Sequence, residues 1–244
     1  MENTSYVALS RQTALWNRMD VVANNLANMN TDGYRAQHSL FHDYVVKAPG
    51  GEGPFDEKIA YVQDYGNWRD TRPGPVHMTG NPLDVAIEGE GFFRIDTPEG
   101  ERFSRLGRFH LDNEGQIVTA QGHPVLSEAG EPFFLAPNER DVTINGDGSV
   151  STENGLIGNI ALASFEDQQK LRSVGHGLFT TDQDPQPVDT PNLVQGGLEG
   201  SNVKPLQEMT NMIEVQRAFE ATQQMIERED QRLSKAIETI TKTR

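Results

Sequence analysis

Two histidines four residues apart, His38 and His42, are side chains whose type and spacing could bind a metal ion. On a helix they would face the same side, with Asp43 beside them, and imidazole and carboxylate groups are common zinc ligands. However, the other four histidines are scattered and the sequence marks no third ligand near this pair. The favoured interpretation is a solvent-exposed pair, and we expect no metal site here.

Two acidic stretches could bind calcium or carry out acid–base chemistry. Residues 141–146 have some features of a calcium loop, but Thr152 occupies the twelfth position, where a carboxylate is needed. Residues 112–114 place two carboxylates close together, in a composition typical of a hairpin turn. The sequence has no cysteine, and it lacks the G-x-S-x-G, G-x-G-x-x-G, H-E-x-x-H and Walker A motifs. We therefore expect neither an enzyme nor a cofactor.

Composition and charge narrow the class of protein further. Of the 244 residues 35% are hydrophobic, and 23 glycines and 13 prolines predict a loop-rich chain with extended connections. The net charge is −15, and residues 36–204 carry 26 acidic and 12 basic side chains, whereas both ends are nearly neutral. An acidic middle argues against a nucleic-acid partner. No apolar run is long enough to span a membrane, and Glu2 and Asp20 interrupt any secretory signal.

The two ends of the chain have helical periodicity. After Pro205 the last segment holds no glycine or proline. Its seam advances in steps of three and four, through Met212, Val215, Phe219, Thr222, Ile226, Glu229, Leu233, Ala236 and Ile240. The first segment has a matching seam, through Ala8, Gln12, Leu15, Met19, Val22, Leu26 and Met29, which stops at residues 30–33. The matching periods predict that the two helices pack together like a coiled coil.

Between the ends, residues 83–165 alternate apolar and polar side chains in short runs separated by glycine-containing turns. This pattern favours a small β-sandwich or barrel. The predicted fold class is α+β: paired long N- and C-terminal helices, extended connectors, and a central all-β domain. The predicted segments are residues 1–35 (helical), 36–79 (connector, with a half-exposed β-ribbon), 80–165 (β domain), 166–200 (return connector) and 201–244 (helical, packing with 1–35).

Four motifs resemble those of the flagellar axial proteins, the rod and hook family. They are residues 21–34 (VVANNLANMNTDGY), 80–93 (GNPLDVAIEGEGFF), 103–119 (FSRLGRFHLDNEGQIVT), and 198–203 (LEGSNV) with the segments that follow it. They cover both ends and the middle of the chain in the family's order. Within the family, the opening residues 5–22 are most similar to the proximal rod type.

The resemblance implies a structural subunit of the flagellar basal-body rod, which transmits torque to the hook. Its partners would be copies of itself, other proximal and distal rod proteins, the flagellar export apparatus and surrounding ring proteins. It would be exported without a cleaved signal into a rod that crosses the periplasm. The alternatives are a distal rod protein or, in another class, a free-standing hydrolase or binding module with a polar pocket in residues 80–165.

The residues expected at the helix and subunit interface come from both terminal segments. The first contributes Leu15, Met19, Val22 and Leu26, with Asn24, Asn25 and Asn28 as polar contacts. The second contributes Met212, Ile213, Val215, Phe219, Ile226 and Leu233. A charge buried among these apolar side chains is expected to block assembly.

Overall fold

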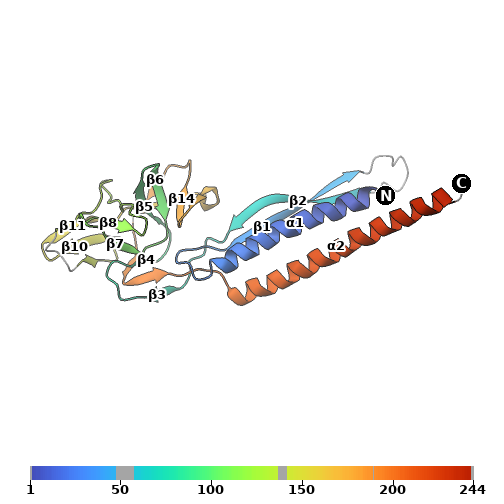
Figure 1. Ribbon diagram of the computed structural model, residues 1–244. Helices are drawn as coiled ribbons and strands as arrows, with labels where there is room; N and C mark the ends of the chain where they lie inside the picture. The colour runs from blue at the N-terminus through green and yellow to red at the C-terminus, as the bar shows by residue number, and fades with distance from the viewer. Residues whose placement is uncertain (1, 48–57, 137–141, 189, 243–244) are drawn as a thin grey trace. The chain divides into compact units, whose positions relative to one another are not determined.

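The structure, a computed structural model, describes residues 2–47, 58–136, 142–188 and 190–242 (Figure 1). The chain divides into two compact units. The first, here the helical unit, contains helices α1 (Glu2–Ala27) and α2 (Pro205–Lys242) and strands β1 (Gln37–Lys47) and β2 (Lys58–Arg69). The second, here the β body, contains the segments Asn28–Ala36 and Asp70–Val203.

Helix α2 begins where its sequence favours a helix start. Pro205 stands at its first position, where its missing N–H group leaves no hydrogen bond unmade. Glu208 lies in the first turn, where the helix dipole favours negative charge. The 38 residues of the helix include no glycine and no second proline, so nothing in the sequence ends the helix earlier.

Strands β1 and β2 form a long antiparallel hairpin that pairs Gln37 with Arg69 at one end and Lys47 with Lys58 at the other. A bulge lies next to Leu40, opposite Gly66, whose φ of 123° suits glycine. Helix α1 contacts this hairpin as well as α2. The helical unit is therefore built from a helix pair and a strand pair.

The expectation of long paired coiled-coil helices was wrong. The structure has one N-terminal and one C-terminal helix, of 26 and 38 residues, and a mostly antiparallel β body. A coiled coil needs one continuous seam that faces a helical partner. Helix α1 instead packs against both α2 and the hairpin. Its buried side chains therefore do not follow one series of steps of three and four; they are Ala8, Ala14, Val21, Val22 and Asn25. The α+β class itself is correct.

Every strand pair described in the β body is antiparallel. The largest sheet has the order β13-β14-β6-β5-β12-β15, formed by Arg172–Gly175, Leu178–Thr180, Gly100–Ser104, Phe92–Thr97, Leu162–Ser164 and Gln186–Pro187. A three-stranded sheet contains β11 (Gly155–Asn159), β10 (Ser149–Thr152) and β9 (Thr143–Ile144). The short 3-10 helix η1 spans Gln168–Lys170.

Three two-stranded sheets complete the body. They pair β16 (Leu193–Gln195) with β4 (Val85–Ile87), β17 (Gly197–Glu199) with β3 (Val76–Met78), and β7 (Phe109–Leu111) with β8 (Ile117–Thr119). Two of them join segments more than a hundred residues apart in the sequence. The returning part of the chain, residues 193–199, is thus hydrogen-bonded to the strands with which the body begins.

The core of the β body follows from alternation along β5. Phe93 and Ile95 have no exposed surface and belong to the main apolar cluster, together with Val85 and Val150. Phe92, on the other face of the same strand, joins a second cluster with Phe103 and Phe165. Successive strand residues point to opposite faces, so both faces of the large sheet carry apolar side chains.

Candidate assembly surface

The structure places most of the predicted interface residues in the helical unit, at different depths. Val22, Asn25 and Val215 are buried. Leu15, Met19, Leu26, Met212, Phe219, Ile226 and Leu233 are half-buried, and Asn24 and Ile213 are exposed. Asn28 is half-buried and lies in the β body. Their assignment to a subunit interface remains a prediction.

Asn25 is a fully buried polar side chain that joins three elements of the helical unit. Its amide nitrogen donates to the backbone oxygen of Gln37 at 2.8 Å, and its oxygen accepts from the backbone nitrogen of Gln37 at 2.9 Å. The same nitrogen lies 3.3 Å from the Glu208 carboxylate of α2. The side chain thereby satisfies a backbone pair at the start of β1, as a neighbouring strand would.

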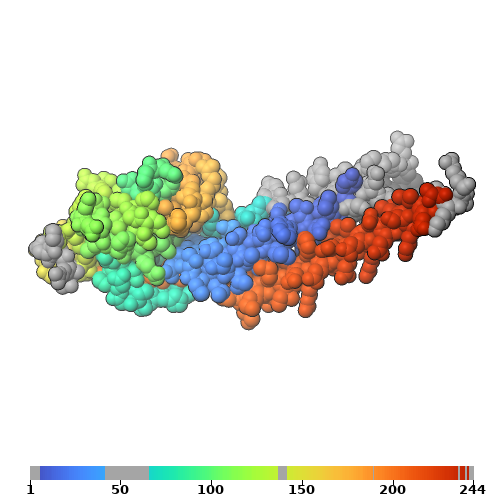
Figure 2. Space-filling view, viewed as in Figure 1, coloured from blue at the N-terminus to red at the C-terminus, as the bar shows by residue number. Residues whose placement is uncertain are grey.

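An aromatic contact links the two helices further along. The rings of Trp16 and Phe219 lie with centroids 6.0 Å apart, tilted by 52°. Figure 2 shows α1, in blue, lying along α2, in red, in this region. Trp16 nevertheless remains 55% exposed, so the contact covers only part of its indole.

Large apolar side chains are exposed along both helices. They are Tyr6, Leu9 and Trp16 on α1, and Leu206, Met209, Ile213, Met225 and Ile237 on α2. Most are at least half exposed. A series of this kind on one pair of elements is typical of a surface that another protein covers.

A groove of about 250 Å³ opens beside the buried part of α1. Its apolar lining comes from Val21 and Val22 of α1 and Phe41 of β1, and its polar lining includes Arg18, Glu208 and Asn211. The hydroxyl of Ser39, also in the lining, is buried without a hydrogen-bond partner. The groove is a small concave surface with a mixed polar and apolar lining.

The β body contains a buried ionic cluster that the sequence analysis did not identify. The Arg105 guanidinium binds the Glu199 carboxylate, with Nη2 at 2.6 Å from Oε2, and both side chains are only 1% exposed. Arg105 also donates to the backbone oxygens of Ile87, Gly89 and Gly91. Burial lowers the pKa of Arg105, and Glu199 opposes that shift. The pair supplies the compensation that a buried charge requires.

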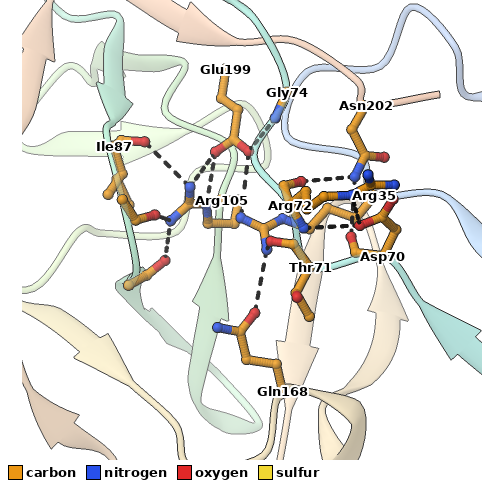
Figure 3. Close-up of polar contacts among 12 residues, drawn as sticks. Arg35, Asp70, Thr71, Arg72, Gly74, Ile87, Arg105, Gln168, Glu199 and Asn202 are labelled. Carbon is orange, nitrogen blue, oxygen red and sulfur yellow. Dashed lines mark hydrogen bonds and ion pairs between the residues drawn. The ribbon is translucent and has the colours of Figure 1, made fainter. Parts of the chain in front are cut away.

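Glu199 and Asn202 extend this cluster to the segments that connect the two units (Figure 3). The second oxygen of Glu199 accepts from the backbone nitrogen of Gly74 at 3.1 Å and lies 3.5 Å from Arg35 Nη2. Arg35 also donates to the backbone oxygen of Thr71. We call Arg35, Arg105, Glu199 and Asn202 the linker clamp.

The linker clamp had a weak signal in the sequence. Arg105, Glu199 and Asn202 all lie inside motifs that carry the family resemblance, Arg105 in residues 103–119 and the others in residues 198–203. Arginine and glutamate are rarely buried, and 94 residues separate this pair. Periodicity and local spacing could not therefore bring these two side chains together.

The stretches first considered for metal or acid–base chemistry form local structure where the structure describes them. His38 stacks on Trp68 at 5.6 Å; the His42 and Asp43 side chains and all of Asp141 lie outside what is described. Asp112 accepts backbone hydrogen bonds from Glu114 and Gln116 within a turn. Asp147 similarly accepts from Ser149, which lowers the pKa of its carboxyl. The described side chains contain no group of three or more His, Asp or Glu that could hold a metal.

A cavity of about 420 Å³ in the β body is lined by Arg94, Glu128, residues 160–163 and residues 185–188. Its two charged groups already have partners: Arg94 pairs with Glu101, and Glu128 accepts from Asn159 at 3.1 Å. Neither charged group of the lining is therefore left without a partner. Among the described residues, neither helix is long and apolar enough to cross a membrane.

Three family models match the chain in sequence order. Residues 6–35 match flagella basal body rod protein, residues 86–152 match the flagellar hook protein FlgE/F/G D1 domain, and residues 194–239 match the flagellar basal body rod FlgEFG protein C-terminal region. These matches define a structural protein of the flagellar axial class. They leave no support for the alternative of a hydrolase, because this family is structural and not enzymatic.

The chain belongs to the flagellar basal-body rod proteins. It is 37% identical to the flagellar basal-body rod protein FlgF of Caulobacter vibrioides, over 99% of each chain. It is 35% identical to FlgF of Mesorhizobium japonicum, over 98% of each chain. Identity to the rod protein FlgG of a Buchnera aphidicola subspecies is 33%, over 89% of this chain and 92% of that one.

Membership of this family makes the chain a structural rod subunit of the flagellar basal body that assembles with other rod and hook proteins. The FlgF proteins of Caulobacter vibrioides and Mesorhizobium japonicum match it better than the Buchnera FlgG in both identity and coverage. The predicted resemblance to the proximal rod type is therefore confirmed.

Proposed function

We propose that the chain assembles through α1 and α2 into the proximal part of the flagellar rod and there transmits torque towards the hook. The observation that carries the proposal is the series of large apolar side chains exposed along both helices. Each contact with a neighbour removes apolar surface from water, which stabilises the assembly by about 25 cal/mol per Å² of buried apolar surface. Neighbouring copies and other rod proteins are the partners that the family supplies.

Several of the predicted interface residues contribute to this surface. Leu26, Phe219 and Ile226 are half-buried in the isolated chain, so each retains surface that a neighbouring subunit can cover. Ile213, 49% exposed, presents still more. Contacts in which one subunit uses a different patch from its neighbour produce an open helical assembly when the rotation between neighbours does not close a ring, and a rod requires that geometry.

The route and position of the chain form part of the same proposal. We infer export through the flagellar export apparatus without a cleaved signal, followed by incorporation into a rod that crosses the periplasm and faces surrounding ring proteins. The family resemblance supports this inference, and the lack of cysteine means that no disulfide can form before export. The intact mass of the subunit in purified basal bodies tests it: loss of N-terminal residues other than the initiator methionine would contradict it.

Single charges placed on the helices test assembly directly. Leu26→Asp and Phe219→Asp should each abolish rod formation, because a neighbouring subunit would bury an unpaired carboxylate. Leu26→Met and Phe219→Met keep an apolar side chain at the same two positions and should leave rods intact. Rods are counted by electron microscopy of basal bodies, and normal rods in both test variants would refute the proposed interface.

Location along the rod separates the proximal assignment from the distal one. A tag inserted at Asn154, in the exposed turn between β10 and β11, should be labelled at the end of the rod nearer the inner membrane. Label confined to the end nearer the hook would assign the chain to the distal rod instead.

A further inference from the structure

The chain passes between its two units four times, after Ala27, Ala36, Arg69 and Val203. Within the β body these crossings depart from only three segments, residues 28–36, 70–76 and 197–203. These segments are the only covalent routes by which a force applied to the terminal helices or to the hairpin reaches the β body. How the segments are joined to one another therefore decides how such a force is distributed.

Asn202 joins all three segments with one side chain. Its oxygen accepts from the backbone nitrogen of Ala36 at 2.7 Å, and its nitrogen donates to the backbone oxygens of Asp70 at 3.1 Å and Arg72 at 2.8 Å. The backbone nitrogen of Asn202 adds a bond to the oxygen of Tyr34 at 3.3 Å. The side-chain amide thus uses its acceptor and both of its donors on the connecting segments.

Glu199 joins the same segments and anchors them in the body. Its carboxylate binds Arg35 of the first segment and the backbone of Gly74 in the second, and its backbone oxygen accepts from Gly33 at 2.7 Å. Its other carboxylate oxygen binds Arg105, which is fastened to the backbone oxygens of residues 87–91. Figure 3 shows Glu199 between the two arginines.

The segments also approach one another at backbone contact distance. A Cβ atom on Gly74 would overlap the backbone oxygen of Gly200, and one on Gly33 would lie 2.9 Å from the backbone carbon of Arg105. Gly33 in addition has φ = 65°, a conformation that glycine adopts without strain. Glycine at these two positions lets the hydrogen bonds of the linker clamp form.

We propose that the linker clamp makes the three connecting segments a single mechanical element, through which tension and torque enter the β body. Asn202 and Glu199 are its positioning residues: they hold the segments in register so that one cannot slide without the others. This inference rests on the proposed function for its purpose in the rod. The mechanical coupling itself is a property of the single chain and can be tested on the isolated protein.

Single-molecule pulling tests the coupling, because the chain has no natural cysteine and accepts two unique thiol handles. Cysteines at the exposed positions Asn30 and Lys204 apply force across the linker clamp. Cysteines at Gln121 and Glu153, exposed turn residues of the β body, apply force elsewhere in the same unit. Each pair is placed in the full chain with Asn202, with Asn202→Ala, and with Asn192→Ala, a matched control whose exposed side chain binds Glu88.

With handles at 30 and 204, Asn202→Ala should shorten the lifetime at constant force by at least about tenfold, because three hydrogen bonds of the loaded contact are lost. With handles at 121 and 153, the lifetime of the Asn202→Ala variant should change less than about twofold. The Asn192→Ala variant should change the lifetime with neither pair of handles. A residue that only stabilises the body would shorten both lifetimes equally. Equal shortening, or no change across 30 and 204, would overturn the proposal, and neither result depends on whether the rod assembles.

Discussion

The helical unit and the β body bury their apolar side chains in different ways. In the β body, bulky residues such as Phe93 and Ile95 have no exposed surface, and the two faces of the large sheet have separate apolar clusters. Among the side chains described in the helical unit, the buried apolar ones are small, namely Ala8, Ala14, Val21, Val22 and Val215, while Trp16, Met225 and Ile237 are at least half exposed. The β body therefore contains a closed core of bulky side chains, whereas the described part of the helical unit buries only small apolar ones and resembles a unit that lacks a neighbour.

The same contrast holds for buried polar groups. The β body buries the Arg105–Glu199 pair with several further hydrogen bonds to each partner. The helical unit buries Asn25 and Glu208, which are 3.3 Å apart. In both units a buried polar side chain binds the backbone of a segment distant in the sequence, so these contacts specify how the segments lie within each unit.

The largest expected effect comes from emptying the core of the β body. Phe93→Ala should lower the free energy of unfolding of that unit by about 3–5 kcal/mol, through lost burial and the cavity that remains. Both tryptophans, Trp16 and Trp68, belong to the helical unit, so their fluorescence follows that unit while circular dichroism follows the whole chain. Urea unfolding with both probes measures the effect.

A matched control for this substitution is Phe134→Ala, because Phe134 is 55% exposed. It should change the free energy of unfolding by no more than about 0.5 kcal/mol. If Phe93→Ala and Phe134→Ala lower the free energy of unfolding equally, the assignment of Phe93 to a closed core is contradicted.

An intermediate effect is expected in the helical unit at Asn25. Asn25→Ala removes both hydrogen bonds to the backbone of Gln37 and leaves buried groups unsatisfied, which should cost about 1–3 kcal/mol. The shift should be seen in tryptophan fluorescence during urea unfolding. Asn24→Ala makes the same gain in helix propensity at an exposed position, so an equal loss in that variant would contradict the assigned role of Asn25.

The smallest effect on the isolated chain is expected at Trp16. Trp16→Ala should change the free energy of unfolding by about 1 kcal/mol or less, because the indole is mainly exposed and contacts one ring of α2. Rod formation in cells should nevertheless fall sharply, as counted in purified basal bodies. If Trp16→Ala loses as much stability as Phe93→Ala, or if it assembles into normal rods, the proposed difference between the two units is contradicted.

Some parts of the fold could be predicted from the sequence, and other parts could not. The helix from Pro205 onward and the strands containing Val85 and Phe93 were predictable, because local periodicity determines them. The partner of α1 was not, because residues 36–79 show no sustained period, and the pairing of β1 with β2 depends on contacts across a long loop. That hairpin takes part of the surface of α1 that a coiled-coil interpretation assigns to α2.

The candidate site was predictable to a similar degree. Half-buried Leu26 and Phe219 follow from the seams, whereas Ile213, also expected at the interface, lies beside the seam of α2 and is exposed. Asn25 was expected as a polar contact of the helix and subunit interface, and in the structure it binds Gln37 and Glu208 of its own chain. The Arg105–Glu199 pair could not be predicted, since a buried ion pair depends on tertiary neighbours that no local pattern encodes.

Limited proteolysis with mass spectrometry most directly tests the central claim that neighbours complete the helical unit and not the β body. The purified chain at high dilution is compared with the same chain in isolated rods. In the dilute chain, cleavage should occur first in α1 and α2, while a fragment containing residues 80–165 survives; in rods, both helices should resist. If α1 and α2 resist as strongly in the dilute chain as in rods, the helical unit is complete on its own and the account is contradicted.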